Sequence, residues 1–237
     1  MNASCSDSSI RSDDRATWPE VASLIEVGNE FHRRGWSLAT SSNYSAVLDR
    51  DPFRLLVTAS GRDKSRLTPD DFVVIDELGL PTEGESRPSA EAHLHLAAAV
   101  RPEIGAVLHT HSVWGTLLSD VFHEHGVLEL HGYEMIKGLE GVVTHDHTLR
   151  IPIFENTQDI PSLAVMVRDY FTSPEGPYFY GFLIRRHGLY TWGRDLQDAR
   201  RHVEALEFLF EVRGRGLSMH SPLPRALPQK PSNSEQK

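Results

Sequence analysis

Residues 104–115 read IGAVLHTHSVWG, an apolar run that ends in two histidines separated by one residue. The run GAVL indicates a buried strand, and side chains along a strand point alternately to its two faces. If the strand continues through the pair, His109 and His111 lie on the same face and can reach one metal ion. The chain contains 13 histidines, so two buried, hydrogen-bonded histidines that bind nothing are an equal alternative on spacing alone.

Outward from this strand, the sequence alternates between strand-like and helical patterns. Apolar residues recur at helical spacing from Thr17 to Gly35, in residues 87–100, in residues 162–171, and after Asp195, which is a suitable helix cap. We therefore expect helices packed on a mixed sheet. Turn residues bound the predicted strands, which are SAVLD (45–49), FRLLVTA (53–59), FVVID (72–76), TLRIPIF (148–154), YFYGFLIRR (178–186) and GLYTWG (188–193).

Composition limits the number of domains and the partners. We predict a single domain over residues 16–217 and mobile polar tails over residues 1–15 and 218–237. The chain has 24 Lys and Arg against 33 Asp and Glu, a formal net charge of −9, which argues against nucleic acid as a partner. Cys5 is the single cysteine, so no intrachain disulfide can form. Without an apolar stretch of membrane-spanning length or a signal peptide, we expect a cytoplasmic protein with no membrane partner.

Most of the remaining histidines do not suggest a metal site. His93 and His95 fall on a predicted helix, where residues two apart diverge by about 200° and cannot bind one ion together. We expect one of them at the edge of the core and the other on the surface. The pairs in residues 123–125 and 145–147 lie in polar, turn-like stretches and are expected to be solvated.

His187 is a candidate third ligand beside His109 and His111. It follows an apolar strand, and Gly188 is expected to let the backbone turn sharply there. Three neutral imidazoles with an open position describe a catalytic zinc site that can polarise a carbonyl group. Glu91 is a fourth ligand or a base beside the metal, or else a first-turn glutamate that stabilises the helix dipole.

The blocks RPSAE (87–91), AVLHTHS (106–112) and RRHGLYTWG (185–193) resemble the metal-site blocks of the class II aldolase and adducin family. Together they span most of the chain between the predicted tails. The resemblance implies a three-layer α/β/α sandwich with a central mixed, largely antiparallel sheet. It also implies a homotetramer whose active sites lie near subunit boundaries.

Two further blocks, HGYEMIKGLEG (131–141) and IPIFENTQDIPSLA (151–164), resemble the dehydratase branch of this family. That branch converts 5-methylthioribulose 1-phosphate to 2,3-diketo-5-methylthiopentyl 1-phosphate in methionine salvage. The implied chemistry begins with a zinc ion that polarises the C2 carbonyl and thereby acidifies the C3 proton; the C4 hydroxyl then leaves. Proton transfer by a glutamate would be helped by a pKa raised in a largely closed site.

The resemblance also implies the roles of individual residues. His109, His111 and His187 would bind one Zn²⁺ per subunit, and Glu134 would be the catalytic acid/base. Glu91 would be a second catalytic residue, beside the metal. Taken without the family, Glu134 in its short helical stretch reads as a surface residue.

The sugar phosphate would be held by small polar loops, SSNYS (41–45) and TASGRDK (58–64), whose hydroxyl and backbone N–H groups suit a phosphate dianion. Without the family, both loops read as ordinary turns and Lys137 as a solvated lysine. The predicted phosphate contacts are Ser41, Asn43, Ser60, Gly61 and Lys137.

Two alternative functions stay open at the level of sequence. A ketose-phosphate aldolase or pentulose-phosphate 4-epimerase would use the same three histidines, and Glu91 does not separate these activities, because some dehydratases carry Cys at this position whereas the aldolases carry Glu. A non-catalytic adducin-like module would have little reason to keep all three histidines.

Overall fold

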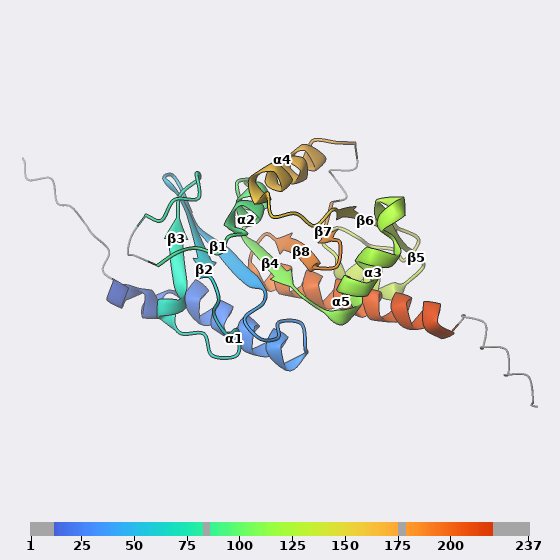
Figure 1. Ribbon diagram of the computed structural model, residues 1–237, viewed down its shortest axis with the longest axis horizontal. Coiled ribbons are helices and arrows are strands. Elements are labelled where there is room, and N and C mark those ends of the chain that lie inside the picture. The colour runs from blue at the N-terminus through green and yellow to red at the C-terminus, as the bar shows by residue number, and fades with distance from the viewer. Residues whose placement is uncertain (1–11, 83–85, 175–178, 220–237) are drawn as a thin grey trace, which may run out of the picture.

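The computed structural model describes residues 12–82, 86–174 and 179–219 (Figure 1). Its strands form one sheet in the order β3-β2-β1-β4-β8-β7-β6-β5. All neighbouring strands are antiparallel except β6 and β7, which are parallel, so the predicted mixed, largely antiparallel sheet is confirmed. The strands are β1 (Asn43–Arg50), β2 (Phe53–Thr58), β3 (Phe72–Ile75), β4 (Ala106–Thr110), β5 (Val127–His131), β6 (Thr148–Phe154), β7 (Gly181–Ile184) and β8 (Gly188–Gly193).

Helices cover both faces of the sheet (Figure 1). Helices α2 and α4 pack against each other over one face, while α1 and α5 cover the other and α3 packs on α5. This arrangement is the predicted three-layer α/β/α sandwich. The α-helices are α1 (Pro19–Arg33), α2 (Ala92–Ala99), α3 (Val113–Val121), α4 (Ile160–Phe171) and α5 (Leu196–Met219), and the 3-10 helices are η1 (Ser12–Thr17), η2 (Pro69–Asp71), η3 (His123–His125) and η4 (Glu134–Gly138).

The alternation of side chains along the strands determines which layer each residue enters. In β4, Val107 packs into the core under α2 and α4, whereas Leu108 packs into the core under α1. Two residues on from Val107, His109 therefore lies on the α2 side of the sheet, and Thr110 faces α5. The hydrogen bond from the Thr110 hydroxyl to Glu207 of α5 agrees with this register.

Three details differ from the sequence-based predictions. Helix α2 begins at Ala92 rather than near Pro88, which places Glu91 just before the helix instead of in its first turn. Neither α3 nor β5 was predicted. Helix α3 has only nine residues and begins shortly after the histidine pair. Strand β5 is a five-residue edge strand that includes polar side chains.

The ends of the predicted domain also differ from the structure. The predicted N-terminal tail overlaps η1 over residues 12–15, where the buried Arg15 donates a hydrogen bond to the carbonyl oxygen of Phe72. At the other end, α5 continues to Met219, past the predicted boundary at residue 217. The rest of both tails, including Cys5, lies outside the described residues. No helix in the described part of the chain is long and apolar enough to span a membrane.

Candidate metal centre

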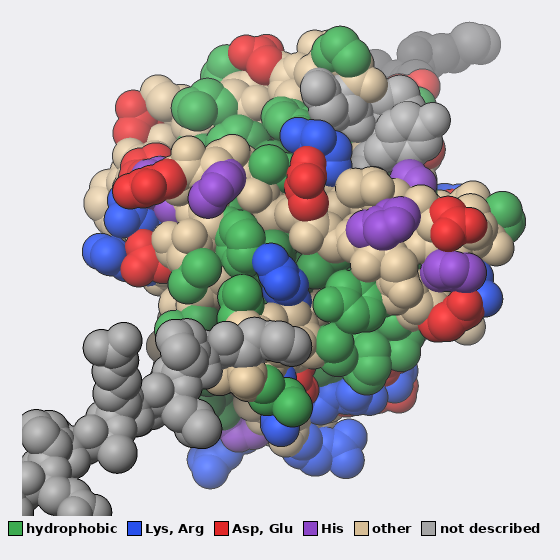
Figure 2. Space-filling model, turned by 90° about the vertical axis from the view of Figure 1, so that its right-hand side faces the viewer, with side chains coloured by type: hydrophobic (Ala, Val, Ile, Leu, Met, Phe, Trp, Pro, Cys, Tyr) green, Lys and Arg blue, Asp and Glu red, His purple; other side chains and the backbone are tan. Residues whose placement is uncertain are grey.

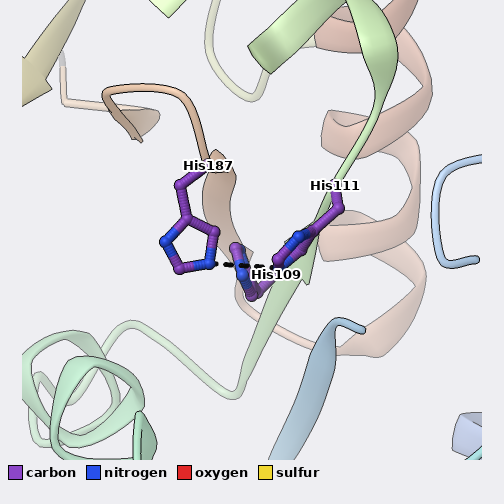
Figure 3. Close-up of side chains that lie close together, drawn as sticks. All are labelled: His109, His111 and His187. Atoms are coloured by element: carbon purple, nitrogen blue, oxygen red, sulfur yellow. Dashed lines mark hydrogen bonds between the residues drawn. The ribbon is translucent and has the colours of Figure 1, made fainter. Parts of the chain in front are cut away.

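Three histidines from adjacent strands converge where β4 ends and the β7–β8 turn begins (Figure 3). His109 is in β4, His111 follows that strand, and His187 lies in the turn. One ring nitrogen from each lies within 4.8 Å of the others, and the Nε2 atoms of His111 and His187 are 3.1 Å apart. The predicted shared face of His109 and His111 is confirmed, and His187 is the third member as predicted.

The tautomer of His109 leaves a lone pair aimed at the cluster. Its Nδ1–H donates to the carbonyl oxygen of Leu189 at 2.8 Å, so Nε2 carries no proton and can only accept. This Nε2 is fully buried, and no group in the described chain donates to it. A buried nitrogen without a partner costs free energy, which a bound cation would offset.

All three imidazoles are held in the neutral form that metal binding requires. Burial lowers the pKa of His109 well below its ordinary value, and the neighbouring His111 and His187 lower it further. Burial and the proximity of His187 lower the pKa of His111 to about 4, and burial also lowers the pKa of His187. At neutral pH the three rings therefore offer lone pairs rather than charges.

A carboxylate completes the set of donors. The Oε1 atom of Glu91 lies 3.2 Å from the Nε2 atom of His187, and its Oε2 atom lies 3.6 Å from the Nε2 atom of His109. Ligands about 2.0–2.1 Å from a tetrahedral zinc ion are about 3.3 Å from one another. The His111–His187 and Glu91–His187 separations of 3.1 and 3.2 Å are close to that value, and all three histidine nitrogens lie within 4.8 Å of one another. The residues present therefore fit a zinc ion, with Glu91 as a fourth ligand or as a base beside it.

Buried hydrogen bonds hold Glu91 in place. Its Oε2 atom accepts from the side-chain amide of Asn43 at 2.7 Å and from the Tyr190 hydroxyl at 2.9 Å. The Tyr190 ring stacks on the ring of His109, with centroids 3.9 Å apart. One tyrosine thus fixes both a histidine and the carboxylate next to it.

Behind Asn43, the fully buried His95 extends this network. Its Nε2–H donates to the Oδ1 atom of Asn43, and its Nδ1 accepts from the Ser45 hydroxyl at 2.8 Å. Burial lowers the pKa of His95 to about 4, so it stays neutral. His95 is buried and His93 is exposed, which confirms that this pair does not bind one ion together.

A cavity of about 250 Å³ opens beside the histidines and contains the predicted phosphate loops. Ser41, Asn43, Ser60 and Gly61 line it together with Glu91, His111 and His187. The structure thereby brings four of the five predicted phosphate contacts to the cluster. Ser89 and residues 156–158 also line the cavity, although they were not predicted to do so, and Tyr190 holds Glu91 through a hydrogen bond.

Gly188 serves a different purpose from the one predicted. The left-handed backbone conformation in the β7–β8 turn belongs to Arg186, with φ 54°, and Gly188 is the first residue of β8. A Cβ atom at Gly188 would lie 1.9 Å from the carbonyl oxygen of Thr110. Glycine is therefore required because β4 and β8 approach closely between the ligands.

Glu134 and Lys137 do not line the cavity. They form an ion pair with each other on η4, and Glu134 also pairs with His145 at 3.1 Å. The Glu134 side chain is 68% exposed. Its pKa is lowered, first by the hydrogen bond from Lys137 and also by His145, so the expected raised pKa in a closed site is wrong for the single chain.

The remaining histidines lie mainly on the end of the molecule formed by α3, β5 and the end of α5. Figure 2 shows this face, with separate histidine side chains among charged groups and hydrophobic side chains near the centre. His123 pairs with Glu155, and His131 with the Thr148 hydroxyl. Within the described residues, only the cluster of His109, His111 and His187 gathers three possible metal ligands.

Comparison with known proteins agrees with this geometry. Residues 22–213 match the family model described as the class II aldolase and adducin N-terminal domain. The chain is 51% identical over 191 residues to a methylthioribulose-1-phosphate dehydratase of Marinobacter nauticus, covering 80% of this chain and 89% of the relative. It is 44% identical over 206 residues to the enzyme of that name from Xanthomonas campestris, covering 86% and 92%. Its fold is similar to a solved L-fuculose 1-phosphate aldolase, with a TM-score of 0.70, 24% identity, and coverage of 89% of this chain and 93% of that one.

Proposed function

Since the chain belongs to the class II aldolase and adducin family, we propose that it is a zinc-dependent hydro-lyase that dehydrates 5-methylthioribulose 1-phosphate. The product is 2,3-diketo-5-methylthiopentyl 1-phosphate, and the pathway is methionine salvage. The observation that carries the proposal is the buried three-histidine cluster with Glu91 in a chain that is 44–51% identical to dehydratases over most of its length. We also propose that the protein acts in the cytoplasm.

His109, His111 and His187 would hold the zinc ion. When bound, it would supply Lewis-acid polarisation of the substrate C2 carbonyl, so that a C3 proton becomes acidic. Glu91 lies beside the cluster at the position of a fourth ligand or of a base. Tyr190 and Asn43 keep its carboxylate turned toward the histidines.

The elimination needs one base and one acid. A base takes the C3 proton, and the electrons of the C3–H bond form a C2–C3 double bond while a pair from the C2 carbonyl moves to its oxygen. As the C2 carbonyl re-forms, the C2–C3 pair shifts to form a C3–C4 double bond, and the C4 hydroxyl leaves with a proton from an acid as water. The resulting enol tautomerises to the diketone. We assign the acid/base role to Glu134, whose ion pair with Lys137 keeps it charged until substrate binds.

Glu134 is exposed and outside the cavity of its own chain, so we propose that it acts in the site of a neighbouring subunit of a homotetramer. Three aliphatic side chains on the outer face of α3 support subunit contact near the histidines. Val113, Leu117 and Val121 are 64%, 49% and 60% exposed, and Val113 lies two residues after His111. Lys137 would accompany Glu134 and contact the substrate phosphate.

The phosphate would sit in the cavity beside the cluster. Ser41, Ser60 and Gly61 offer hydroxyl and backbone N–H groups to it, and Gly61 adopts a φ of 71°, which favours glycine. Asn43 lines the same cavity, but its amide is already bonded to Glu91 and Ser89. We therefore propose that Asn43 acts in substrate binding through the position of Glu91 as well as through direct contact.

The activity is tested with zinc-loaded protein and 5-methylthioribulose 1-phosphate, with diketone formation followed spectroscopically. Product formation is expected, and its absence from fully loaded protein would refute the dehydratase. L-Fuculose 1-phosphate is the matched aldolase substrate, and aldehyde release from it without diketone formation would favour the aldolase alternative. Lack of both reactions would favour a non-catalytic module.

The shared site is tested by mixing two inactive variants. Glu134→Gln and His109→Ala should each lose most turnover, and Glu134→Gln should keep its zinc. If Glu134 serves the neighbouring subunit, co-refolded mixtures contain some sites with both residues intact and regain activity. If both residues act within one chain, the mixture stays as inactive as its components.

A further inference from the structure

Lys64 is a buried ammonium group that the proposed reaction does not yet use. Only 1% of the residue is exposed, and its Nζ donates one hydrogen bond, to the carbonyl oxygen of Arg62 at 2.6 Å. No carboxylate within the described chain forms an ion pair with it. The nearest candidate in sequence, Asp63, accepts instead from the backbone and hydroxyl of Ser65.

This charge belongs to the segment that lines the cavity. Lys64 ends the segment TASGRDK, of which Ala59, Ser60 and Gly61 line the cavity, and its bond to the Arg62 carbonyl oxygen joins the buried ammonium group to this loop. Burial lowers the pKa of Lys64 to about 8, so the group remains charged at neutral pH.

Among the described residues, no lysine or arginine side chain lines the cavity. The lining consists of hydroxyl, amide, aliphatic, backbone and histidine groups and one carboxylate, Glu91. The charges of Asp63 and Asp71 act on this ammonium, but neither carboxylate forms an ion pair with it, and a buried charge without a paired counter-ion is costly. An anion bound on the other side of the loop would add a further counter-charge.

We propose that Lys64 is a positioning residue that holds the Ser60–Gly61–Arg62 loop and provides the positive field for the substrate's phosphate group. The phosphate contacts the loop, whereas the ammonium acts through the loop from its buried side. This inference rests on the proposed sugar-phosphate lyase, because it assigns the phosphate end of that substrate to this loop.

Inorganic phosphate binding to the zinc-loaded protein tests the role without turnover. Lys64→Met keeps the length of the side chain and removes its charge, and we expect phosphate affinity to fall on the order of tenfold. Arg66→Met is the matched control, since it removes a positive charge from an exposed position two residues after Lys64, and its phosphate affinity should stay within about twofold. Zinc content should be unchanged in both variants.

Kinetic and thermal-unfolding measurements test the role of Lys64 independently of phosphate binding. With 5-methylthioribulose 1-phosphate, Lys64→Met should raise KM on the order of tenfold and change kcat less, because the field acts at the phosphate rather than at the reacting carbons. The unfolding temperature without phosphate should stay the same or rise, since an uncompensated buried charge is removed. A smaller rise in this temperature on adding phosphate is also expected.

Unchanged phosphate affinity in Lys64→Met overturns the proposal, whether or not the variant is less stable. If Lys64→Met does not fold, Lys64→Gln and Lys64→Arg replace it, and phosphate should be retained by the charged variant and lost by the neutral one. Equal affinity of these two variants for phosphate also overturns the proposal. Absence of dehydration by the wild-type protein, with the expected loss of phosphate binding in Lys64→Met, would refute the proposed function alone.

Discussion

The wild-type chain should become less stable as the pH rises to neutral, and replacing Glu207 by Gln should abolish this effect. Glu207 lies on α5 directly behind the histidine strand and is 3% exposed. Its Oε1 atom accepts the hydroxyl of Thr110 at 2.6 Å, and its Oε2 atom has no hydrogen-bond partner. Burial raises the pKa of Glu207 from 4.5 to about 7, although the nearby hydroxyl groups of Ser112 and Thr110 oppose the shift.

The direction of this pH effect depends on whether the folded or the unfolded chain binds the Glu207 proton more tightly. Between pH 4.5 and about 7 the folded chain holds this proton and the unfolded chain does not, so stability falls as the pH rises through that window. Below pH 4.5 both states are protonated and the effect is absent. The difference between the two pKa values corresponds to about 3 kcal/mol, reached near pH 8.

Glutamine has a similar shape and no charge. The free energy of unfolding of Glu207→Gln should therefore equal that of the wild type at pH 4 and exceed it by about 3 kcal/mol at pH 8. Urea unfolding of both proteins from pH 4 to pH 8 measures the difference, and other titrating groups cancel because they are common to both. Zinc should be removed from both samples so that metal binding does not contribute. A difference that stays constant within about 0.5 kcal/mol over this range would refute the reasoning.

Three further variants address the metal centre. Tyr190→Phe removes one hydrogen bond to the carboxylate beside the histidines, so we expect kcat/KM to fall about 10- to 100-fold with zinc retained, as measured by kinetics and metal analysis. His109→Ala should weaken zinc binding more than about 100-fold in chelator competition, whereas the exposed His93→Ala should leave it unchanged; equal zinc binding in the two would contradict the assignment. Gly188→Ala should lower the free energy of unfolding by about 3 kcal/mol or more, because its Cβ would overlap the Thr110 carbonyl oxygen; a wild-type unfolding temperature would show that the strands can separate at little cost.

Local patterns in the sequence predicted most of the fold. Apolar runs bounded by turn residues predicted β1, β2, β3 and β6 to within about two residues, because buried strands need continuous apolar side chains. The missed elements, α3 and β5, are short, and each is stabilised by packing on distant segments, chiefly α5 and β6. At nine and five residues, their own sequences are too short for the periodicity to identify them.

Within the site, the sequence by itself determined that His109 and His111 share a face, because strand alternation is a local property of the backbone. Only the tertiary structure decided that His187, 76 residues after His111, joins them. It also decided that Glu91 turns from its helix toward the histidines, and that Tyr190 and Asn43 hold it there. These contacts depend on the pairing of β4 with β1 on one side and β8 on the other. Which strands pair is determined by the burial of whole sheet faces, so it cannot be read from any single residue in the sequence.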